Sequence, residues 1–453
     1  MTKSPLTVPA QYRAFAAVTP IEFPPIMGNL EYSGWRDEQM SWKRSCYIGD
    51  WSFVPQIRVK GPDALRLFTD LSVNSFAQFP LNRAKHCVMC NEFGKVVVEG
   101  ILLRHDEDDL EFEAVPAWVL YHLKTGGYDA EASFPMTHKL QVSGPSSLGL
   151  LEKLTETTLR DIKFMHTKVT AIGGSQVTML RQGMAGEIGF ELHGPIEQHD
   201  QLFEAVLDAG QEFGIRRLGR RTFHVNHVEA CYPTTGMEYW NAVSDERRTD
   251  FLEWMDREEN IPAEWRGTPL EGAWKVSLST ALMGSWDGDS VEELYRSPIE
   301  MGWGKSVNFD HDFIGRAALE EEMKSPTRTI VTLEFNSDDM IAIYASLFSD
   351  GDTYLPLDLP HFPYIACWAD WIHKDGVKVG HSTFPAYSYY FRKVLALSFI
   401  EPRYSEPGTE VTVLWGNPDE PQTAIRATVC RAPYKKDNRR GDLSTLAPSG
   451  HES

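Results

Sequence analysis

A segment near the middle of the chain, RQGMAGEIGFELHGP, combines closely spaced glycines with two glutamates. Gly183, Gly186 and Gly189 recur at a spacing of three, which is typical of a turn that lets backbone approach a ligand. A phosphate would require bare N–H groups and positive charge here, whereas Glu187 and Glu191 bring negative charge. A carboxylate instead suits a planar edge with two N–H donors, such as that of arginine, guanine or a pterin. The alternative interpretation is a β-turn with surface glutamates.

Other residues of catalytic type give weaker signals. The chain has no P-loop, no Gly-x-Ser-x-Gly, no His-Glu-x-x-His, and no Gly-x-Gly-x-x-Gly between a strand and a helix. Cys87 and Cys90 form a Cys-x-x-Cys, but no second close pair follows to complete a zinc site, so we interpret them as part of a strand. His224 and His227, with Glu229 nearby, can share a helix face, where packing is a commoner role than metal binding. We therefore expect no metal.

The composition limits the class of protein. The 453 residues are 42% hydrophobic and 24% charged, as in a globular protein of two or three domains. The net charge of −20 argues against nucleic acid or an anionic membrane as a partner, but it permits an anionic small molecule. The sequence has neither an apolar run of about 20 residues nor a secretory signal, and its six cysteines are scattered. We expect a cytoplasmic monomer or homodimer.

Hydrophobic periodicity predicts a mixture of helices and strands. Helices are expected at 35–45, 61–76, 116–128, 199–214 and 313–325. Strands are expected at 56–61, 91–115 (as a hairpin), 176–183 and 190–195. After SPTRTIVTLEF, which ends at residue 335, the pattern changes to short strands with turns through residue 432, which indicates a separate β-domain. Residues 1–30 are interpreted as an extended arm and 243–300 as a long connection.

Five segments in order resemble one known family. The segment MLRQGMAGEIGFELHGP resembles the Arg-x-Gly-x-x-Gly-x-x-Gly-x-Glu segment of the folate-dependent aminomethyltransferases, typified by the glycine cleavage T-protein. The other four are GDWSFVPQIRVKGPDALRLF, GKVVVEGILL, SPIEMGWGKSVNFDHDFIGRAAL and GHSTFPAYSYYFRKVLALSFIEPRYSEPGTEVTV. Together they span nearly the whole chain beyond the N-terminal arm. The resemblance implies an α+β fold, the three-domain cloverleaf of aminomethyltransferases with a C-terminal β-barrel domain.

The same resemblance implies a division of the chain. Residues 1–50 with 135–245 would form a discontinuous folate-binding domain, and 51–134 with 246–328 a second α+β domain. Residues 329–435 would form the C-terminal β-barrel domain. Residues 436–453 are polar, and we expect them to be a disordered tail.

Within the family, RQGMAG, NHVEACYP and EYSGWRDEQMSWKRS are most similar to the tetrahydrofolate-dependent aryl O-demethylases. These enzymes move a methyl group from a methoxylated aromatic acid such as vanillate or syringate to tetrahydrofolate, leaving a phenol. The resemblance implies that Glu191 holds the pterin edge and that Glu99 lies near the reacting folate nitrogens, although Glu99–Gly100 replaces two aspartates of the T-protein. The alternative for Glu99 is a surface acid at a strand end. Trp254 and His227 are further candidates for folate contact, with a core position as the alternative for Trp254.

The chemistry of an aryl methyl ether requires an acid. Phenolate is a mediocre leaving group, so a proton must reach the ether oxygen as the C–O bond breaks. A tyrosine suits this role because its pKa is close to that of the released phenol. We choose Tyr239 in YPTTGMEYW, on the loop that matches the O-demethylases, with Tyr232 as the reserve. Tyr32 is a second candidate for the catalytic pocket.

The substrate pocket is expected to include Trp51, Phe53, Tyr232 and Trp240. Phe53 stands where the family usually has histidine, and FEAVPAW lacks the arginine that vanillate-type members carry for the substrate carboxylate. The hypothesis is a substrate less hydroxylated than vanillate, such as the chlorinated methoxybenzoate dicamba, with its carboxylate held elsewhere. Two alternatives stay open: an aminomethyltransferase or demethylase of another small methyl donor, and a folate-binding protein without catalysis.

Overall fold

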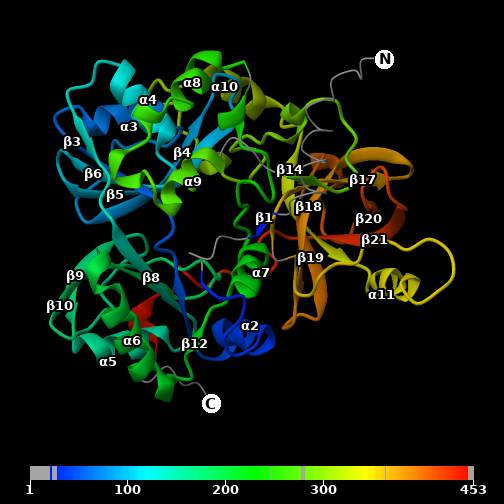
Figure 1. Ribbon diagram of the computed structural model, residues 1–453, viewed down its shortest axis with the longest axis horizontal. Helices are drawn as coiled ribbons and strands as arrows, with labels where there is room; N and C mark the ends of the chain where they lie inside the picture. Colours follow the sequence, from blue (N-terminus) through cyan, green and yellow to red (C-terminus); the bar gives the residue numbers. More distant parts are fainter. Residues whose placement is uncertain (1–20, 23–27, 246, 277–280, 363, 447–453) are drawn as a thin grey trace.

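The computed structural model describes residues 21–22, 28–245, 247–276, 281–362 and 364–446. Figure 1 shows three lobes, two of them built from a sheet with helices and the third, at the right, from a barrel. Most of the expected N-terminal arm lies outside the described residues. Its described part includes β1 (Ile21–Glu22), which pairs with β15 (Tyr364–Ile365).

The first lobe contains a six-stranded sheet in the order β12-β2-β8-β11-β10-β9. The strands are β2 (Tyr47–Asp50), β8 (Thr137–Ser143), β9 (Thr167–Ile172), β10 (Ser175–Leu180), β11 (Gly189–Pro195) and β12 (Arg216–Arg217). Its apolar core includes residues of α5 (Ser147–Thr155) and α6 (His199–Gly210), with Phe190 and Leu192 of the sheet. Strand β2 enters from a distant part of the chain, so the sheet ties residues 47–50 to 137–217.

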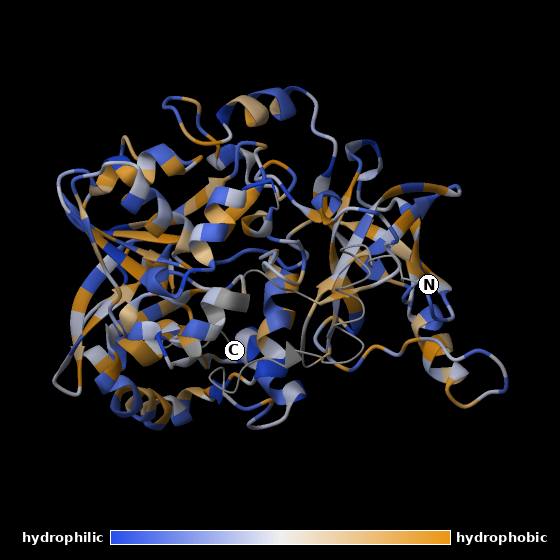
Figure 2. Cartoon of the chain, turned by 45° about the horizontal axis from the view of Figure 1, so that its top comes forward, coloured by the Kyte–Doolittle hydropathy of each residue, from blue (hydrophilic) through white to orange (hydrophobic). Residues whose placement is uncertain are grey.

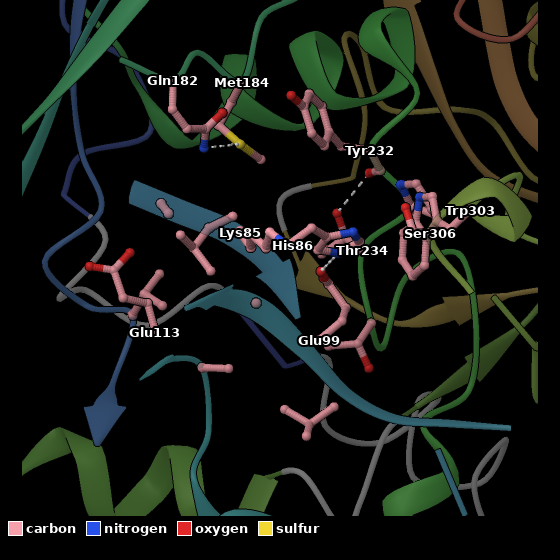
Figure 3. A pocket seen from close by; sticks show the side chains of 18 of the residues that line it. Lys85, His86, Glu99, Glu113, Gln182, Met184, Tyr232, Thr234, Trp303 and Ser306 are labelled. Carbon is pink, nitrogen blue, oxygen red and sulfur yellow. Dashed lines mark hydrogen bonds and ion pairs between the residues drawn. The ribbon is translucent and has the colours of Figure 1, made fainter. Parts of the chain in front are cut away.

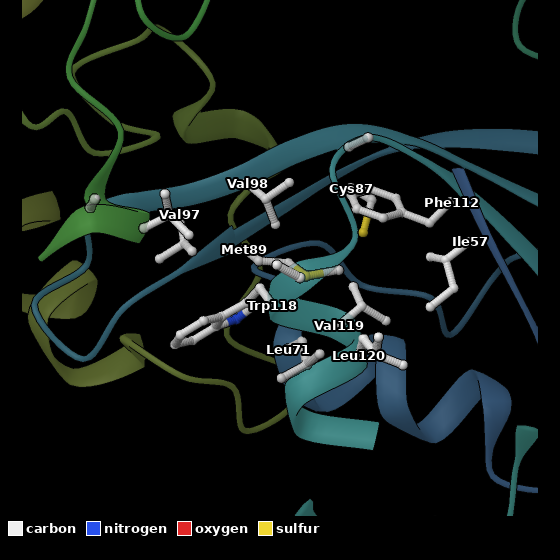
Figure 4. Close-up of a cluster of buried hydrophobic side chains, with 14 of the residues drawn as sticks. Ile57, Leu71, Cys87, Met89, Val97, Val98, Phe112, Trp118, Val119 and Leu120 are labelled. Carbon is white, nitrogen blue, oxygen red and sulfur yellow. The ribbon is translucent and has the colours of Figure 1, made fainter. Parts of the chain in front are cut away.

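The second lobe contains a five-stranded sheet in the order β4-β5-β6-β3-β7. The strands are β3 (Gln56–Lys60), β4 (Arg83–Cys90), β5 (Val96–Asp106), β6 (Asp109–Glu113) and β7 (Glu131–Ser133). Figure 4 shows Cys87, Met89 and Phe112 of this sheet facing Trp118 and Leu120 of α4 (Ala117–Thr125), with α3 (Ala64–Leu71) beside it. Cys87 and Cys90 are buried free thiols in a strand, as expected.

The third lobe is a closed barrel in the order β14-β19-β18-β17-β20-β21. The strands are β14 (Thr329–Phe335), β17 (Asp370–Lys374), β18 (Val377–Ser388), β19 (Lys393–Ile400), β20 (Glu410–Trp415) and β21 (Thr423–Cys430). Burial alternates along β20 and β21, as expected when one face of a strand points into a barrel. Figure 2 shows hydrophobic and hydrophilic residues mixed along the strands of the barrel at the right. The helix α11 (Ser337–Ser346) packs against β21.

The expected α+β fold with three lobes and a C-terminal barrel is therefore confirmed. The described residues of the predicted long connection include the helices α8 (Thr249–Met255) and α9 (Pro269–Val276) and the strand β13 (Leu282–Met283), which pairs with β16 (Cys367–Trp368). The helices predicted at 35–45 and 313–325 are α2 (Trp35–Arg44) and α10 (Arg316–Lys324). No helix among the described residues combines the length and apolarity needed to cross a membrane.

The end of the chain differs from expectation. Residues 436–446 are packed against the first lobe rather than disordered, and residues 447–453 lie outside the described ranges. The Leu443 side chain is buried in the core of that lobe, and the Arg160 guanidinium donates a hydrogen bond of 3.0 Å to the Leu443 carbonyl. Arg181 donates to the carbonyls of Arg439 and Gly441. A polar segment can thus be ordered by partners that composition does not reveal.

The buried carboxylate of Glu229 joins elements of different lobes. Glu229 lies on α7 (Arg220–Ala230) and accepts hydrogen bonds from Trp42 Nε1 (3.2 Å) and Lys43 Nζ (2.6 Å) of α2. Its other oxygen accepts from Ser388 Oγ of the barrel at 2.6 Å. Burial lowers the pKa of Lys43 and the Glu229 carboxylate opposes this effect, so the ammonium ion depends on its partner. Glu229 is therefore structural, in agreement with the packing role expected for this part of the chain.

We expect Glu229→Gln to reduce the free energy of unfolding by about 3–5 kcal/mol, because the Lys43 charge would stay buried without its counterion. Glu321→Gln is the control, since the Glu321–Lys324 pair is solvent-exposed and such pairs contribute about 1 kcal/mol or less. Urea unfolding followed by circular dichroism measures both variants. Equal losses in the two would show that Lys43 does not need Glu229.

Candidate active site

A cavity of about 1830 Å³ lies where the two sheets, the loop after α7 and the C-terminal segment meet. Single-ligand pockets are commonly about 300–1,000 Å³, so this cavity has room for two small molecules. It is lined by seven of the ten residues predicted for the site: Trp51, Phe53, Glu99, Glu191, His227, Tyr232 and Tyr239. Figure 3 shows part of this lining, with Glu99 and His86 on one side and Gln182 and Met184 on the other.

Glu191 lies on β11, opposite Gln141 of β8 in the strand register. Its Oε1 accepts hydrogen bonds from Gln141 Nε2 (3.1 Å) and Gln182 Nε2 (3.0 Å). Its Oε2 lies 3.2 Å from Nε2 of His193, two residues along the same strand and on the same face. Tyr47 donates its hydroxyl hydrogen to Gln141 Oε1 and so fixes the orientation of that amide. The carboxylate is therefore held rigidly at the cavity wall.

The glycines before Glu191 satisfy a steric need. Gly186 has a φ of +67°, a left-handed conformation that favours glycine. A Cβ at Gly183 would lie 2.6 Å from the Glu187 carbonyl oxygen, and one at Gly189 would lie 2.7 Å from Ser143 Oγ. The Glu187 side chain does not line the cavity and pairs instead with Lys435 and Asn438. Of the two glutamates in the segment, only Glu191 serves the cavity.

A carboxylate–imidazole pair occupies another wall of the cavity. Glu99 Oε2 on β5 lies 2.7 Å from His86 Nε2 on β4, and the His86 ring meets the Trp303 ring edge to face at 4.8 Å. Gly100 follows where the T-protein has a second aspartate, and a Cβ there would lie 2.2 Å from the Glu113 carbonyl oxygen. The backbone thus excludes a side chain at residue 100, which leaves Glu99 as the cavity carboxylate of this segment.

Tyr239 is buried and lines the same cavity. Burial, followed by the charge of Glu99, raises its pKa well above the usual value of a tyrosine, so its hydroxyl stays protonated at neutral pH. Tyr232 lines the cavity too, but its hydroxyl donates to the Gly183 carbonyl oxygen at 3.1 Å. His227 Nδ1 lies 3.2 Å from Thr234 Oγ1, and burial lowers the His227 pKa to about 4. The cavity therefore contains two tyrosines and a neutral imidazole.

Three predicted residues lie outside the main cavity. Tyr32 borders a separate small pocket, where its ring packs under the Arg217 guanidinium at 4.2 Å, so it cannot act beside Tyr239. Trp240 points into the core of the second lobe and donates to Ser244 Oγ at 3.2 Å. Trp254 packs against the rings of Tyr121 and Phe251, which is the core position weighed above. The structure therefore places these three side chains away from the main cavity.

Several charged residues that sequence analysis missed line the cavity. They are Lys163, Arg439 and Arg440; the guanidinium of Arg439 stacks on Tyr232 at 4.7 Å and that of Arg440 on Phe164 at 4.8 Å. The Arg-Arg pair in KKDNRRGD was a signal, but it fell in the segment expected to be disordered. These cations could hold the anionic end of a ligand.

The histidines suspected of sharing a metal site do not form one. His224 is buried against the rings of His361 and Phe384, whereas His227 faces the cavity. Among the described residues, the single group with ligand atoms close enough for a metal consists of Glu113, Glu191 and His193.

Comparison with known proteins identifies the class. The model of the GCVT N-terminal domain matches residues 4–246. A sesamin methylene transferase from a Sinomonas species is 33% identical over 420 residues, covering 89% of this chain and 90% of that protein. A syringate O-demethylase from a Sphingobium species is 32% identical over 439 residues, covering 91% and 90%. The crystal structure of the glycine cleavage system aminomethyltransferase T from Bartonella henselae matches with a TM-score of 0.64 at 16% identity, covering 96% of this chain and 99% of that one.

The fold and the cavity between its lobes are thus those of an aminomethyltransferase-type enzyme. The chain belongs to the glycine cleavage T-protein family. Its expected resemblance to the O-demethylases of that family is confirmed, as are the expectations of a methyltransferase-type enzyme and of tetrahydrofolate.

The residues present fit a folate. The cavity places buried carboxyl groups of Glu113 and Glu191 at one part of its wall, where a flat ring with N–H donors can be held. Lys163, Arg439 and Arg440 supply positive charge for an anionic tail.

Proposed function

We propose that the chain removes the methyl group of a methoxylated aromatic compound and transfers it to N5 of tetrahydrofolate, giving a phenol and 5-methyltetrahydrofolate. The observation that carries this proposal is the joint presence of Tyr239, Glu99 and Glu191 in one cavity large enough for both molecules. The relatives named as a syringate O-demethylase and a sesamin methylene transferase support an aromatic ether as the one-carbon donor.

Tetrahydrofolate supplies a secondary amine, N5, that accepts the methyl carbon. The cavity walls must hold this amine behind the methyl group, opposite the ether oxygen, since the two bonds change in line. Glu191, fixed by Gln141 and Gln182, orients the ring system from one wall. Trp51 and Phe53 present apolar surface to the aromatic ring and exclude water.

Two protons must move for the reaction to balance. As the C–O bond breaks, the Tyr239 hydroxyl donates its proton to the ether oxygen, which leaves as a phenol. Formation of the N–C bond releases the amine proton, which the Glu99 carboxylate accepts with His86 Nε2 beside it at 2.7 Å. The proton taken up by Glu99 then returns to Tyr239 through water in the cavity that both residues line, which restores the two groups for the next turnover.

Purified protein is incubated with tetrahydrofolate and a panel containing syringate, vanillate, dicamba, sesamin and dimethylglycine, and the demethylated product and the folate product are quantified. Equal amounts of phenol and 5-methyltetrahydrofolate from a methoxylated member support the proposal. Folate binding without turnover of any member would favour the non-catalytic alternative, and turnover of dimethylglycine alone would favour a different methyl donor.

The narrower proposal is a chlorinated methoxybenzoate such as dicamba, and it is supported by the apolar wall of Trp51 and Phe53 alone. Faster turnover of vanillate than of dicamba would refute it. Sesamin belongs in the panel because a relative at 33% identity carries that substrate in its name.

We expect Glu99→Gln to lower the single-turnover rate of phenol formation by about 100-fold, because loss of a positioned base typically costs 10²–10⁴-fold. Folate affinity should change by less than about threefold, since a neutral amide keeps the shape of the side chain. His105→Gln is the matched control, because His105 pairs with Glu111 on the same sheet at 3.2 Å but does not line the cavity. A Glu99→Gln rate above a tenth of the wild-type value would remove Glu99 from the mechanism.

A further inference from the structure

Glu113, Glu191 and His193 form a buried group in which the sequence gives a role to Glu191 alone. Glu113 ends β6 of the second lobe, whereas Glu191 and His193 lie on β11 of the first. Their ligand atoms all lie within 4.8 Å of one another. His193 stands between the carboxyl groups, with Nε2 3.2 Å from Glu191 Oε2 and Nδ1 3.2 Å from Glu113 Oε1. The group therefore bridges two lobes at the cavity wall.

Glu191 has little acceptor capacity left. A carboxylate offers about four lone-pair sites. Two of them, on Oε1, are taken by the amides of Gln141 and Gln182, and a third, on Oε2, faces His193. A ring edge with two N–H donors therefore finds one open site on Glu191 and needs a second acceptor beside it.

Glu113 provides that second acceptor. Its side chain is 93% buried, lines the cavity, and appears at the left of the lining in Figure 3. Its Oε1 makes no hydrogen bond to any described residue, because His193 Nδ1 is close but not aligned with it. A buried carboxyl oxygen without a hydrogen bond is costly and therefore rare in native proteins. Burial also raises the pKa of Glu113 to about 7, so an N–H donor on this carboxyl group would stabilise its ionised form.

We propose that Glu113 and Glu191 together hold the N–H edge of the folate's aminopyrimidinone ring, with the ring N–H on Glu191 Oε2 and the 2-amino group on the Glu113 carboxyl group. His193 spaces the two carboxyl groups. Burial opposes a charge on His193, but the adjacent carboxylates of Glu113 and Glu191 leave its pKa raised, which supports an imidazolium that offsets their repulsion. This inference rests on the proposed function only in taking folate as the ligand.

The primary test measures folate binding rather than turnover. Glu113→Gln should raise the Kd for tetrahydrofolate, measured by calorimetry, by about 10- to 100-fold, as expected for one charge-assisted hydrogen bond. Glu111→Gln is the control, because Glu111 lies two residues away on β6, is equally buried, and bonds His105 rather than lining the cavity. Its Kd should stay within about twofold of the wild-type value, since its partner is not a ligand group.

A ligand variant locates the donor. A tetrahydrofolate analogue with methyl in place of the 2-amino group should bind the wild type weakly and should show no further loss with Glu113→Gln. Such non-additivity is expected when the two changes remove one interaction. Should Glu113→Gln fail to fold by circular dichroism, Glu113→Asp, which keeps the charge but withdraws the oxygen, should show the same pattern with a smaller loss.

Three outcomes overturn the inference: an unchanged folate Kd in Glu113→Gln, equal losses in Glu113→Gln and Glu111→Gln, or additive losses with the analogue. An unchanged folate Kd with a raised KM for the aryl ether would assign Glu113 to the aromatic substrate instead. If the wild type binds folate but demethylates nothing, the proposed function fails while the calorimetric test of Glu113 still stands.

Discussion

Tyr239→Phe is expected to lower kcat for O-demethylation by about 10²–10⁴-fold, the usual contribution of a positioned general acid. The variant loses one hydroxyl from a buried side chain, so the cavity keeps its shape and the Kd for tetrahydrofolate should change by less than about twofold. Single-turnover measurement of phenol release separates the chemical step from product release. The variant should lose less kcat with a substrate whose phenol is more acidic, such as a chlorinated one, because that leaving group needs less proton transfer.

The pH dependence supplies a second readout. Burial and the charge of Glu99 raise the pKa of Tyr239 well above its usual value of about 10. A raised pKa means that the hydroxyl keeps its proton throughout the neutral and mildly alkaline range. The wild-type rate should therefore show no alkaline fall caused by Tyr239 below about pH 10. A fall near neutral pH that disappears in Tyr239→Phe would contradict this assignment.

Tyr232→Phe is the matched control for Tyr239→Phe. Both hydroxyls border the cavity, but that of Tyr232 donates its hydrogen to the Gly183 carbonyl oxygen and is committed there. Its loss should lower the rate by less than about tenfold, as expected for one neutral hydrogen bond of about 1 kcal/mol. If Tyr232→Phe were the slower variant, the acid would be the reserve candidate and Tyr239 a wall residue.

The sequence predicts the residues that chemistry and order in the chain identify together. Glu191 follows glycines whose spacing is needed for the turn, and Glu99 lies in the hairpin segment GKVVVEGILL that carries the resemblance. Both line the cavity, as do Trp51 and Phe53. Hydrophobic periodicity also identifies the strands on both sides of the glycine turn, β10 and β11, and the hairpin of β5 and β6.

The side to which a candidate side chain points is harder to predict than which residues are candidates. Tyr239 and Trp240 are neighbours, yet Tyr239 faces the cavity and Trp240 the core of the second lobe. Adjacent side chains of an extended segment point to opposite sides, and the sequence does not say which side is the cavity. Trp254 packs against Tyr121 in the core. The sequence could not choose between a core and a pocket position for it, since aromatic residues suit both equally well.

Contacts between distant segments were inaccessible from the sequence. Glu191 and His193 share a strand face, which alternation predicts, but nothing in the sequence places Glu113 of the other lobe beside them. The C-terminal segment was missed because its composition is polar, while Arg181 and Glu187 supply the partners that order it. Such pairings depend on the tertiary fold.

Glu191→Ala is expected to raise the Kd for tetrahydrofolate by about 100-fold or more, because it removes a charged acceptor and frees the groups that it positions. Without the carboxylate, the amides of Gln141 and Gln182 lose a shared acceptor and His193 loses one of its two anionic neighbours. The ring edge would then meet donors where it needs acceptors. Calorimetry with tetrahydrofolate measures the loss directly, and the aryl ether, bound alone, should keep its affinity.

Glu187→Ala is the control that the segment itself supplies, since Glu187 lies in the turn and Glu191 four residues later on β11. Glu187 pairs with Lys435 and Asn438, so its loss should lower the unfolding midpoint. The Kd for a tetrahydropterin, which lacks the anionic tail that Arg439 and Arg440 would hold, should change by less than about threefold. Equal effects of Glu187→Ala and Glu191→Ala on folate affinity would mean that the turn as a whole, rather than the Glu191 carboxylate, holds the ring. A loss of affinity in Glu191→Ala alone would separate the two roles. Glu187 would then stabilise the fold, and Glu191 would supply the acceptor where the strand meets the cavity.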